Sequence, residues 1–258
     1  MILGIIGGTG IDESIIEVNK KHELSTPYGK PSGEILEGRV NGVDTFFILR
    51  HGKGHAINPS KVPYRANIHA LKELGVTHII APCAVGSLKE EVKPGELVFT
   101  DQFIDKTSLR SETFYDKDKV MHIPMAIPFC PEMRKVLAEG AKELDIPHHR
   151  KGTNVVMEGP RFSTRAESMA NRLLGADTIN MTMVPECVLA REKGMHYAAI
   201  AMVTDYDCWR ETIVDVEEIL TTVRENADKV KRLLTHVAPK LDTKEACPCP
   251  NDWKFATL

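Results

Sequence analysis

The sequence contains no apolar run long enough to cross a membrane as a helix, which needs about 20 mainly apolar residues in succession. It also lacks an excess of basic residues: 33 Lys and Arg stand against 36 Asp and Glu, a formal net charge of −3. Proteins that hold nucleic acid by its phosphates need a basic face, so this balance argues against a nucleic-acid partner. The first residues, MILGIIGGTG, show neither the basic start nor the cleavage site of a signal peptide, and we expect a cytoplasmic protein.

Several enzyme motifs are also missing. The glycine-rich turn GGTG at 7–10 lacks the Gly-Lys-Ser/Thr of a Walker A loop and the glycine spacing of a dinucleotide site. No Gly-x-Ser-x-Gly segment marks a nucleophilic serine. His51 and His55 lie four residues apart, but Gly52 and Gly54 argue against the helix that would align them on zinc. We therefore predict no cofactor and no metal site.

Cysteine is scarce, with six in 258 residues. Cys83, Cys130, Cys187 and Cys208 are scattered among apolar segments, where we interpret them as small buried hydrophobic side chains. The other two form CPCP at 247–250, in a polar tail. A lone Cys-x-Cys without a second pair of ligands argues against zinc. A strained disulfide, a metal contact and cross-linking of the tail stay open as alternatives.

Short apolar runs alternate with segments of helical periodicity along the chain. The runs are typical of buried strands and cover 2–7, 43–49, 78–85, 95–100, 153–157, 177–181 and 197–203. The helical segments cover 64–74, 131–144, 165–174, 185–193 and 216–237. This interleaving predicts an α/β fold with a mixed central β-sheet flanked by helices.

The chain shows no internal repeat, no low-complexity tract and no break in composition. These features predict a single domain over residues 1–238, followed by a C-terminal tail over 239–258 that holds the Cys-x-Cys. The stretch 101–130 is polar and ends rich in proline, so we expect a long irregular loop there.

Polar residues follow directly after many of the apolar runs. In open α/β sheets the carboxyl ends of parallel strands meet at one edge, and ligands bind there. A mainly parallel sheet would therefore bring together Thr9, Arg50, His51, Ser87, Thr182, Asp205 and Asp207.

Asp205 and Asp207 end the run 197–203 in the order Thr-Asp-Tyr-Asp. Side chains alternate along a strand, so the two carboxylates face the same way. They either cap a helix at the surface or accept hydrogen bonds from the N–H groups of a purine. Burial would raise the pKa of such a carboxyl group and let it deliver a proton to a leaving base.

Two glycine-loosened segments are candidates for binding an anion. The turn at 7–10 lets backbone N–H groups approach an anion, although a tight turn explains it equally well. RHGKGH at 50–55 follows a strand and offers Arg50, whose guanidinium matches phosphate oxygens bidentately. The alternative is a solvated basic loop.

The segment EGPRFS at 158–163 joins a strand to a helix. Its Gly-Pro pair makes a sharp turn, and Ser163 is placed to cap the helix with Glu167 as its partner. Phe162 belongs either to the core or to a surface on which a base stacks. Farther along, Thr182 is placed to reach a phosphate, and Met181 either packs on a sugar or fills the core.

Together these segments resemble those of the purine nucleoside phosphorylase family in its trimeric form, and most closely its S-methyl-5'-thioadenosine phosphorylases. The resemblance covers the chain from its start to about residue 235. It rests on GIIGGTG at 4–10, TPYGKPS at 26–32, RHGKGH at 50–55, YRANIHALKELGV at 64–76, VGSLKEEVKPGE at 85–96, DQFIDKT at 101–107, EGPRFSTRAES at 158–168, NMTMVPE at 180–186 and TDYDCW at 204–209.

The resemblance implies a nucleoside phosphorylase fold and a phosphorolysis that gives a free base and a sugar 1-phosphate. The nucleoside implied is S-methyl-5'-thioadenosine, phosphate is a co-substrate, and the assembly is a homotrimer or a dimer of trimers. By resemblance, the phosphate contacts are Thr9, Arg50, His51, Cys83, Thr182 and the backbone amide of Ala84. The nucleoside contacts are Phe162, Ser163, Met181, Asp205, Asp207, Val216 and, from a neighbouring subunit, His122, with Asp205 and Asp207 as the catalytic pair.

Asp205 implies a 6-aminopurine, because the related 6-oxopurine enzymes carry asparagine at the matching place. A broad or 6-oxopurine phosphorylase stays open as an alternative, as does a nucleoside-binding sensor without turnover. Two features depart from the family: Cys83 replaces a hydroxyl or amide side chain, and the segment after Trp209 is shorter than in animal relatives. The CPCP tail resembles the Cys-x-Cys tails of archaeal, heat-stable relatives, in which disulfides occur.

Overall fold

The computed structural model describes residues 1–210, 216–242 and 247–256. Within these residues the strands form one eleven-stranded sheet. The strands are β1 (Leu3–Gly7), β2 (Glu17–His22), β3 (Ile35–Val40), β4 (Val43–Leu49), β5 (His78–Ser87), β6 (Leu97–Phe99), β7 (Gln102–Lys106), β8 (His148–His149), β9 (Thr153–Met157), β10 (Thr178–Asn180) and β11 (His196–Tyr206).

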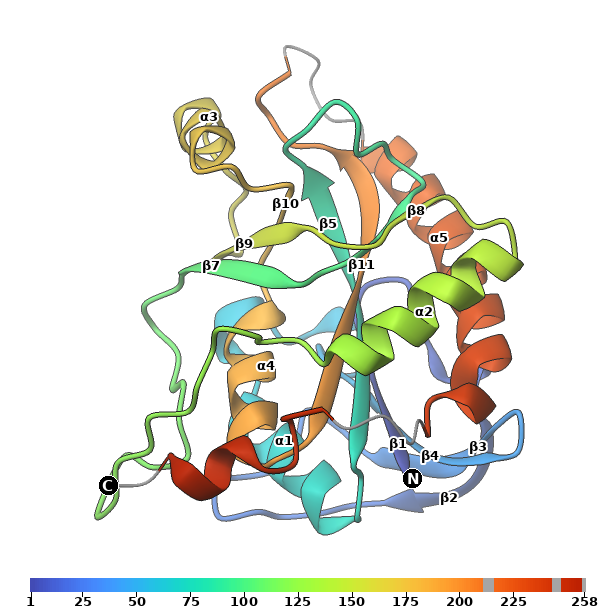
Figure 1. Cartoon of the computed structure of the whole chain (residues 1–258), viewed down its shortest axis with the longest axis vertical. Helices are drawn as coiled ribbons and strands as arrows, with labels where there is room; N and C mark the ends of the chain where they lie inside the picture. Colours follow the sequence, from blue (N-terminus) through green and yellow to red (C-terminus); the bar gives the residue numbers. More distant parts are fainter. Residues whose placement is uncertain (211–215, 243–246, 257–258) are drawn as a thin grey trace.

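Helices cover both faces of this sheet (Figure 1). The α-helices are α1 (Tyr64–Glu73), α2 (Pro131–Glu143), α3 (Arg165–Leu173), α4 (Met183–Glu192) and α5 (Val216–Val237). Short 3₁₀ helices are η1 (Glu13–Ile15), η2 (Lys53–His55), η3 (Pro59–Lys61), η4 (Ala238–Lys240) and η5 (Asp252–Phe255). In the described part of the chain, none of these helices is both long and apolar enough to span a bilayer.

The sheet branches at β5, and this branch places the cavity described below. The strand order is β2-β3-β4-β1-β5-β10-β9-β7, while β11 pairs with β5 along its other edge. β1 pairs with β5 at residues 78–80, and β10 pairs with it at residues 86–87. Among the described residues, neither strand covers that edge of β5 over residues 81–85.

Side chains of β5 and β11 point alternately to the two faces of the sheet and belong to a hydrophobic core on each face. Ile79, Ala81 and Tyr197 pack with residues of α1 and α4. Ile80 and Ala198 pack with residues of α2 and α5. Because the strand period is two, the continuous apolar runs of these strands serve both cores at once.

The predicted fold class is confirmed: helices flank a mixed central sheet. The bounds expected for β4, β9 and α5 match the structure, and the other predicted elements shift by a few residues. β11 is longer than expected and runs to Tyr206, so Asp205 lies inside the strand, where its register on β5 shifts after Val203. The division of the chain after residue 238 stays a prediction.

One expectation about the sheet was wrong. The stretch 101–130 is not wholly irregular, because β7 occupies residues 102–106 and pairs with β9. The sheet is mixed, as predicted, and β10 runs antiparallel to β5. The sequence also did not predict β2, whose residues are exposed apart from the half-buried His22 and carry no apolar run.

Candidate active site

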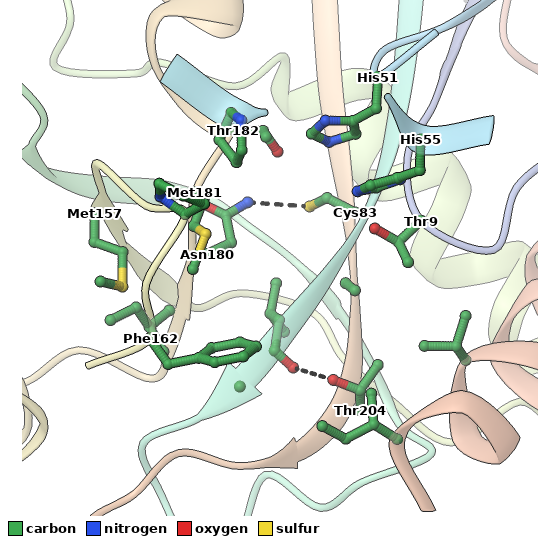
Figure 2. Close-up of a pocket in the computed structure, with 18 of the residues that line it drawn as sticks. Thr9, His51, His55, Cys83, Met157, Phe162, Asn180, Met181, Thr182 and Thr204 are labelled. Carbon is green, nitrogen blue, oxygen red and sulfur yellow. Dashed lines mark hydrogen bonds between the residues drawn. The ribbon is translucent and has the colours of Figure 1, made fainter. Parts of the chain in front are cut away.

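A cavity of about 460 Å³ opens along the uncovered edge of β5. Its walls come from the turn after β1, the loop after β4, the second half of β5, the ends of β10 and β11, and the start of α5. Figure 2 shows His51, His55 and Thr182 along one side of the cavity, with Phe162 and Thr204 along the other. This volume lies within the range of small-molecule sites, about 300–1,000 Å³.

Most of the residues that the sequence nominated meet in this cavity. They are Thr9, Arg50, His51, Cys83, Ala84, Phe162, Ser163, Met181, Thr182, Asp205 and Asp207. Ser87 does not line it, because its hydroxyl turns back to donate to the Lys89 carbonyl at 2.7 Å. His122 is exposed and lies outside the lining. Val216 begins α5, but its side chain lies outside the described residues.

Arg50 forms the floor of one end of the cavity and is 1% exposed. Its Nε and Nη2 donate to the two carboxylate oxygens of Glu186 at 2.8 and 2.9 Å. Nη1 and Nη2 also donate to the carbonyls of Pro82 and Ile6 at 3.2 and 3.3 Å. These bonds use four of the five guanidinium donors, so the bidentate partner of Arg50 is Glu186 rather than a phosphate.

The charge of Arg50 is nevertheless secure. Burial alone lowers the pKa of Arg50, but the Glu186 carboxylate more than offsets it, and the net pKa lies above its usual range. Gly8 permits the close approach of the turn after β1, because a Cβ there would lie 2.5 Å from Nη1 of Arg50. A fixed cation therefore lies directly beneath the glycine-rich turn.

His51 lies beside Arg50 and is uncharged at neutral pH. Burial, followed by the charge of Arg50, lowers the pKa of His51 to about 4. Nδ1 of His51 lies 2.7 Å from the carbonyl oxygen of Ile57, which can only accept, so Nδ1 carries the proton. Nε2 of the neutral ring is left as an acceptor. The ring stacks on His55 with centroids 4.1 Å apart.

Two carboxyl groups form a polar corner at the end of β11. Burial is the main cause that raises the pKa of Asp205, and the neighbouring Asp207 adds to it, while the Thr204 hydroxyl at 2.6 Å opposes it. Oδ2 of Asp207 is buried and has no hydrogen-bond partner among the described residues. A buried acceptor without a partner is costly, so this corner is suited to a ligand that brings N–H donors.

Between these two ends the cavity is largely apolar. Phe162 is 76% exposed and lines the cavity, so it is not a core residue. Its ring reaches into the cavity beside Met157 and Met181 in Figure 2. The α5 wall contributes Leu220 and Val223.

The expected cap of α3 was wrong by one residue. Thr164, not Ser163, caps the helix: its hydroxyl accepts from the Glu167 N–H, and the Glu167 side chain accepts from the Thr164 N–H. Ser163 is thereby released from the helix and lines the cavity, with its hydroxyl 3.6 Å from the Met157 sulfur.

Sequence reasoning missed two residues that hold the site together. Asn180 donates to the Cys83 sulfur at 3.4 Å, which joins β10 to β5, and it accepts from Asn154 of β9 at 2.9 Å. Arg110 donates to the carbonyls of Met181 and Glu158 at 2.6 and 2.7 Å. Arg110 lies in the polar stretch after β7, where nothing in the local sequence distinguishes it from a surface arginine.

A cation and a neutral imidazole lie at one end of the cavity, and at the other end lies a carboxylate oxygen that no described residue hydrogen-bonds. This arrangement suits an enzyme that brings an anion to a base-bearing substrate. The chain belongs to the phosphorylase superfamily, whose family model matches residues 2–239. The S-methyl-5'-thioadenosine phosphorylase of Pyrococcus horikoshii is 54% identical over 247 residues, which cover 96% of this chain and 95% of that protein. The enzyme of the same name from Danio rerio is 49% identical over 259 residues, covering 97% of this chain and 90% of that one.

A solved structure shows the same similarity in three dimensions. Methylthioadenosine phosphorylase from Schistosoma mansoni, in complex with adenine, superposes with a TM-score of 0.90 at 41% identity. The match covers 95% of this chain and 92% of that one.

The buried pair of Arg50 and Glu186 leads to a prediction about stability. Glu186→Gln removes the charge that balances a buried cation, which costs about 3–5 kcal/mol when one partner of such a pair is lost. We expect a loss of that size in the free energy of unfolding, measured by denaturant titration. Asp44→Asn, which breaks the exposed pair with Arg39, is the control and should change stability little. Equal losses in the two variants would contradict the role assigned to Glu186.

Proposed function

We propose that this protein catalyses the phosphorolysis of S-methyl-5'-thioadenosine to adenine and 5-methylthioribose 1-phosphate. The observation that carries the proposal is the cavity itself, with Arg50 and His51 at one end and Asp205 and Asp207 at the other, where Oδ2 of Asp207 has no partner among the described residues. The names of the relatives support the choice of substrate. No cofactor is required, since phosphate is the second substrate.

Phosphate binds at the end of the cavity that holds Thr9, Arg50, His51 and Thr182. The two hydroxyl groups donate to its oxygens, and the remaining N–H and the fixed charge of Arg50 attract it. Nε2 of the neutral His51 accepts a hydrogen bond from the P–O–H group of hydrogen phosphate. Phosphate is thereby held beneath the sugar carbon that it attacks. Because phosphate itself is the nucleophile and is already in position, no nucleophilic side chain is needed.

The base lies at the other end, where negative charge develops on the purine as the glycosidic bond breaks. Asp205 accepts a hydrogen bond from the 6-amino group. The raised pKa of Asp205 also favours its protonated form, which donates to the leaving purine. Asp207 supplies the second acceptor, and Phe162 offers its exposed face for stacking.

The apolar wall of α5 supports the methylthio group of the substrate. Ile219, Leu220 and Val223 line the cavity, and they offer no partner for a 5' hydroxyl. A thioether makes no demand for hydrogen bonds, so it is favoured over a hydroxyl on such a surface. Met181, opposite, packs on the ribose.

A second candidate, a phosphorylase of broader base specificity, is favoured by one observation. The raised pKa of Asp205 gives it a neutral form that can donate to the oxygen of a 6-oxopurine. Methylthioinosine and inosine are therefore the competing substrates.

We also propose a cytoplasmic location, because methylthioadenosine and phosphate are small metabolites.

The position of His122 supports an assembly of more than one chain. His122 is exposed and lies outside the cavity of its own chain, so the role that the resemblance assigns to it, at the 5' end of a substrate, requires a neighbouring subunit. We expect light scattering to give three times the mass of one chain, or six times it for a dimer of trimers. A monomer that retains full activity would contradict this assignment.

The reaction is tested directly by its need for phosphate. We expect adenine to be released from S-methyl-5'-thioadenosine only when phosphate is present, with a sugar 1-phosphate as the second product, both followed by chromatography. Release at the same rate without phosphate would indicate a hydrolase. Tight binding measured by calorimetry with no product would indicate a sensor instead.

Asp205→Asn tests which group reads the purine. The asparagine amide presents a donor to the 6-amino group, and we expect kcat/KM for methylthioadenosine to fall about 10- to 100-fold relative to methylthioinosine. Asp44→Asn, at an exposed residue that does not line the cavity, is the control and should leave the ratio unchanged. If the ratio is also unchanged in Asp205→Asn, another residue recognises position 6 of the purine.

A further inference from the structure

Four side chains that could ligate a metal meet in the fold, outside the active-site cavity. Cys130 directly precedes α2, His196 is the first residue of β11, and Cys247 and Cys249 belong to the C-terminal tail. One ligand atom of each lies within 4.8 Å of the others. None of the four lines the cavity described above.

The separations of these atoms match a tetrahedral metal site. The sulfurs of Cys130 and Cys247 are 3.8 Å apart, and Nδ1 of His196 lies 3.4 and 3.2 Å from them. Zinc takes tetrahedral ligands with Zn–S of about 2.3 Å and Zn–N of about 2.0–2.1 Å, which places sulfurs about 3.8 Å apart and sulfur and nitrogen about 3.5 Å apart. One ion fits among these atoms with little movement.

We propose that Cys130, His196, Cys247 and Cys249 bind one structural zinc ion. Three thiolates and one imidazole form a common donor set of structural zinc, and such soft ligands do not suit magnesium or calcium. Four protein ligands fill the tetrahedron and leave no position for a substrate. The site therefore stabilises the fold and takes no part in phosphorolysis.

A disulfide is a weaker explanation of the cluster. All six cysteines are free in the structure. A disulfide would join two of the three clustered sulfurs, and it would leave the third thiol and the imidazole of His196 without a role. A metal ion uses all four groups.

Cys130 and His196 are held in place by contacts that do not involve the C-terminal tail. The Cys130 N–H donates to the Tyr197 carbonyl at 2.8 Å, which fixes the start of α2 against β11. The His196 ring lies parallel to the His78 ring, with centroids 4.1 Å apart. Cys130 and Cys249 are both 0% exposed, so the ion would be largely shielded from water.

The buried Arg191 is placed to balance the negative charge of the proposed zinc complex. Zinc with three thiolates and a neutral imidazole carries one net negative charge. The buried Arg191 pairs with Asp252 of the tail, and its charge acts on Cys249. Nε and Nη1 of Arg191 have no hydrogen-bond partner in the part of the chain that the structure describes. A cation placed there stabilises an anionic metal complex.

The ion would hold the tail to the body of the protein. In Figure 1 the red C-terminal segment, which includes η5, lies against the body beside α4. The ligands Cys247 and Cys249 stand at the start of this segment, and the Ala256 carbonyl at its other end accepts from the His122 N–H at 2.7 Å. From the sequence we predict no metal site, because Cys130 and His196, which would complete the ligand set of the Cys-x-Cys, lie far from the tail along the chain.

Metal analysis of the protein purified under reducing conditions tests the proposal. We expect about one zinc ion per chain by mass spectrometry of the metals. Cys247→Ser and Cys249→Ser should lose most of it. Cys208→Ser is the matched control, since Cys208 is partly buried but outside the cluster, and it should retain the zinc.

Two further readouts do not depend on these variants folding. Cobalt added to the metal-free wild-type protein should give thiolate-to-cobalt charge-transfer bands and the visible bands of a tetrahedral site. A chelator should lower the Tm of the wild-type protein, because metal that binds only the folded state stabilises it.

The proposal is overturned by any of three results. The first is a reduced protein that takes up no zinc and gives no cobalt–thiolate bands. The second is zinc content that is equal in Cys249→Ser and Cys208→Ser. The third is bound iron in place of zinc.

Discussion

Arg50 and Glu186 form a buried ion pair at which several elements of the fold meet. The guanidinium reaches carbonyls of β1 and β5, Glu186 comes from α4, and the Tyr197 hydroxyl of β11 donates to Glu186 at 2.8 Å. Two charges withdrawn from water are tolerated only when their geometry is good and their other hydrogen bonds are satisfied. The pair therefore requires that these elements be correctly placed, and it fixes the floor of the cavity when they are.

The charge of Arg50 also governs the rest of that end of the cavity. It acts with burial to keep His51 neutral, so the ring keeps a free acceptor nitrogen. At the other end, burial favours the proton on Asp205. The same exclusion of water thus favours a neutral base and a neutral acid at opposite ends of one cavity. Such a separation of roles suits a reaction in which positive charge develops on the sugar and negative charge on the base.

The sequence predicted the elements whose physical signal is local. α5 has a regular apolar stripe, and β4 and β9 coincide with short, mainly apolar runs whose bounds could be recognised in the sequence. β2 lies at an edge with its residues mostly exposed, so it has no apolar signal to find. The direction of β10 depends on the branch at β5, which is a property of the whole sheet.

The same distinction applies to the site. Thr9, Arg50, Asp205 and Asp207 could be nominated because each stands at the end of an apolar run. The partner of Arg50 could not, because Glu186 reaches it only through the packing of α4. The cap of α3 was misplaced by one residue, since Ser163 and Thr164 are both good cap residues and only the geometry separates them.

The branch of the sheet at β5 has a consequence for how this cavity can change over evolutionary time. Residues 81–85 of β5 serve the core and the cavity together, and a shift of one residue would exchange the two faces of the strand. Phe162 and Leu220, by contrast, are exposed side chains that line the cavity from elements other than β5. Mutations can therefore accumulate at these exposed positions, which meet the organic part of a ligand, while the positions of β5 are constrained by the core. New specificities are accessible to this fold without loss of its common chemistry.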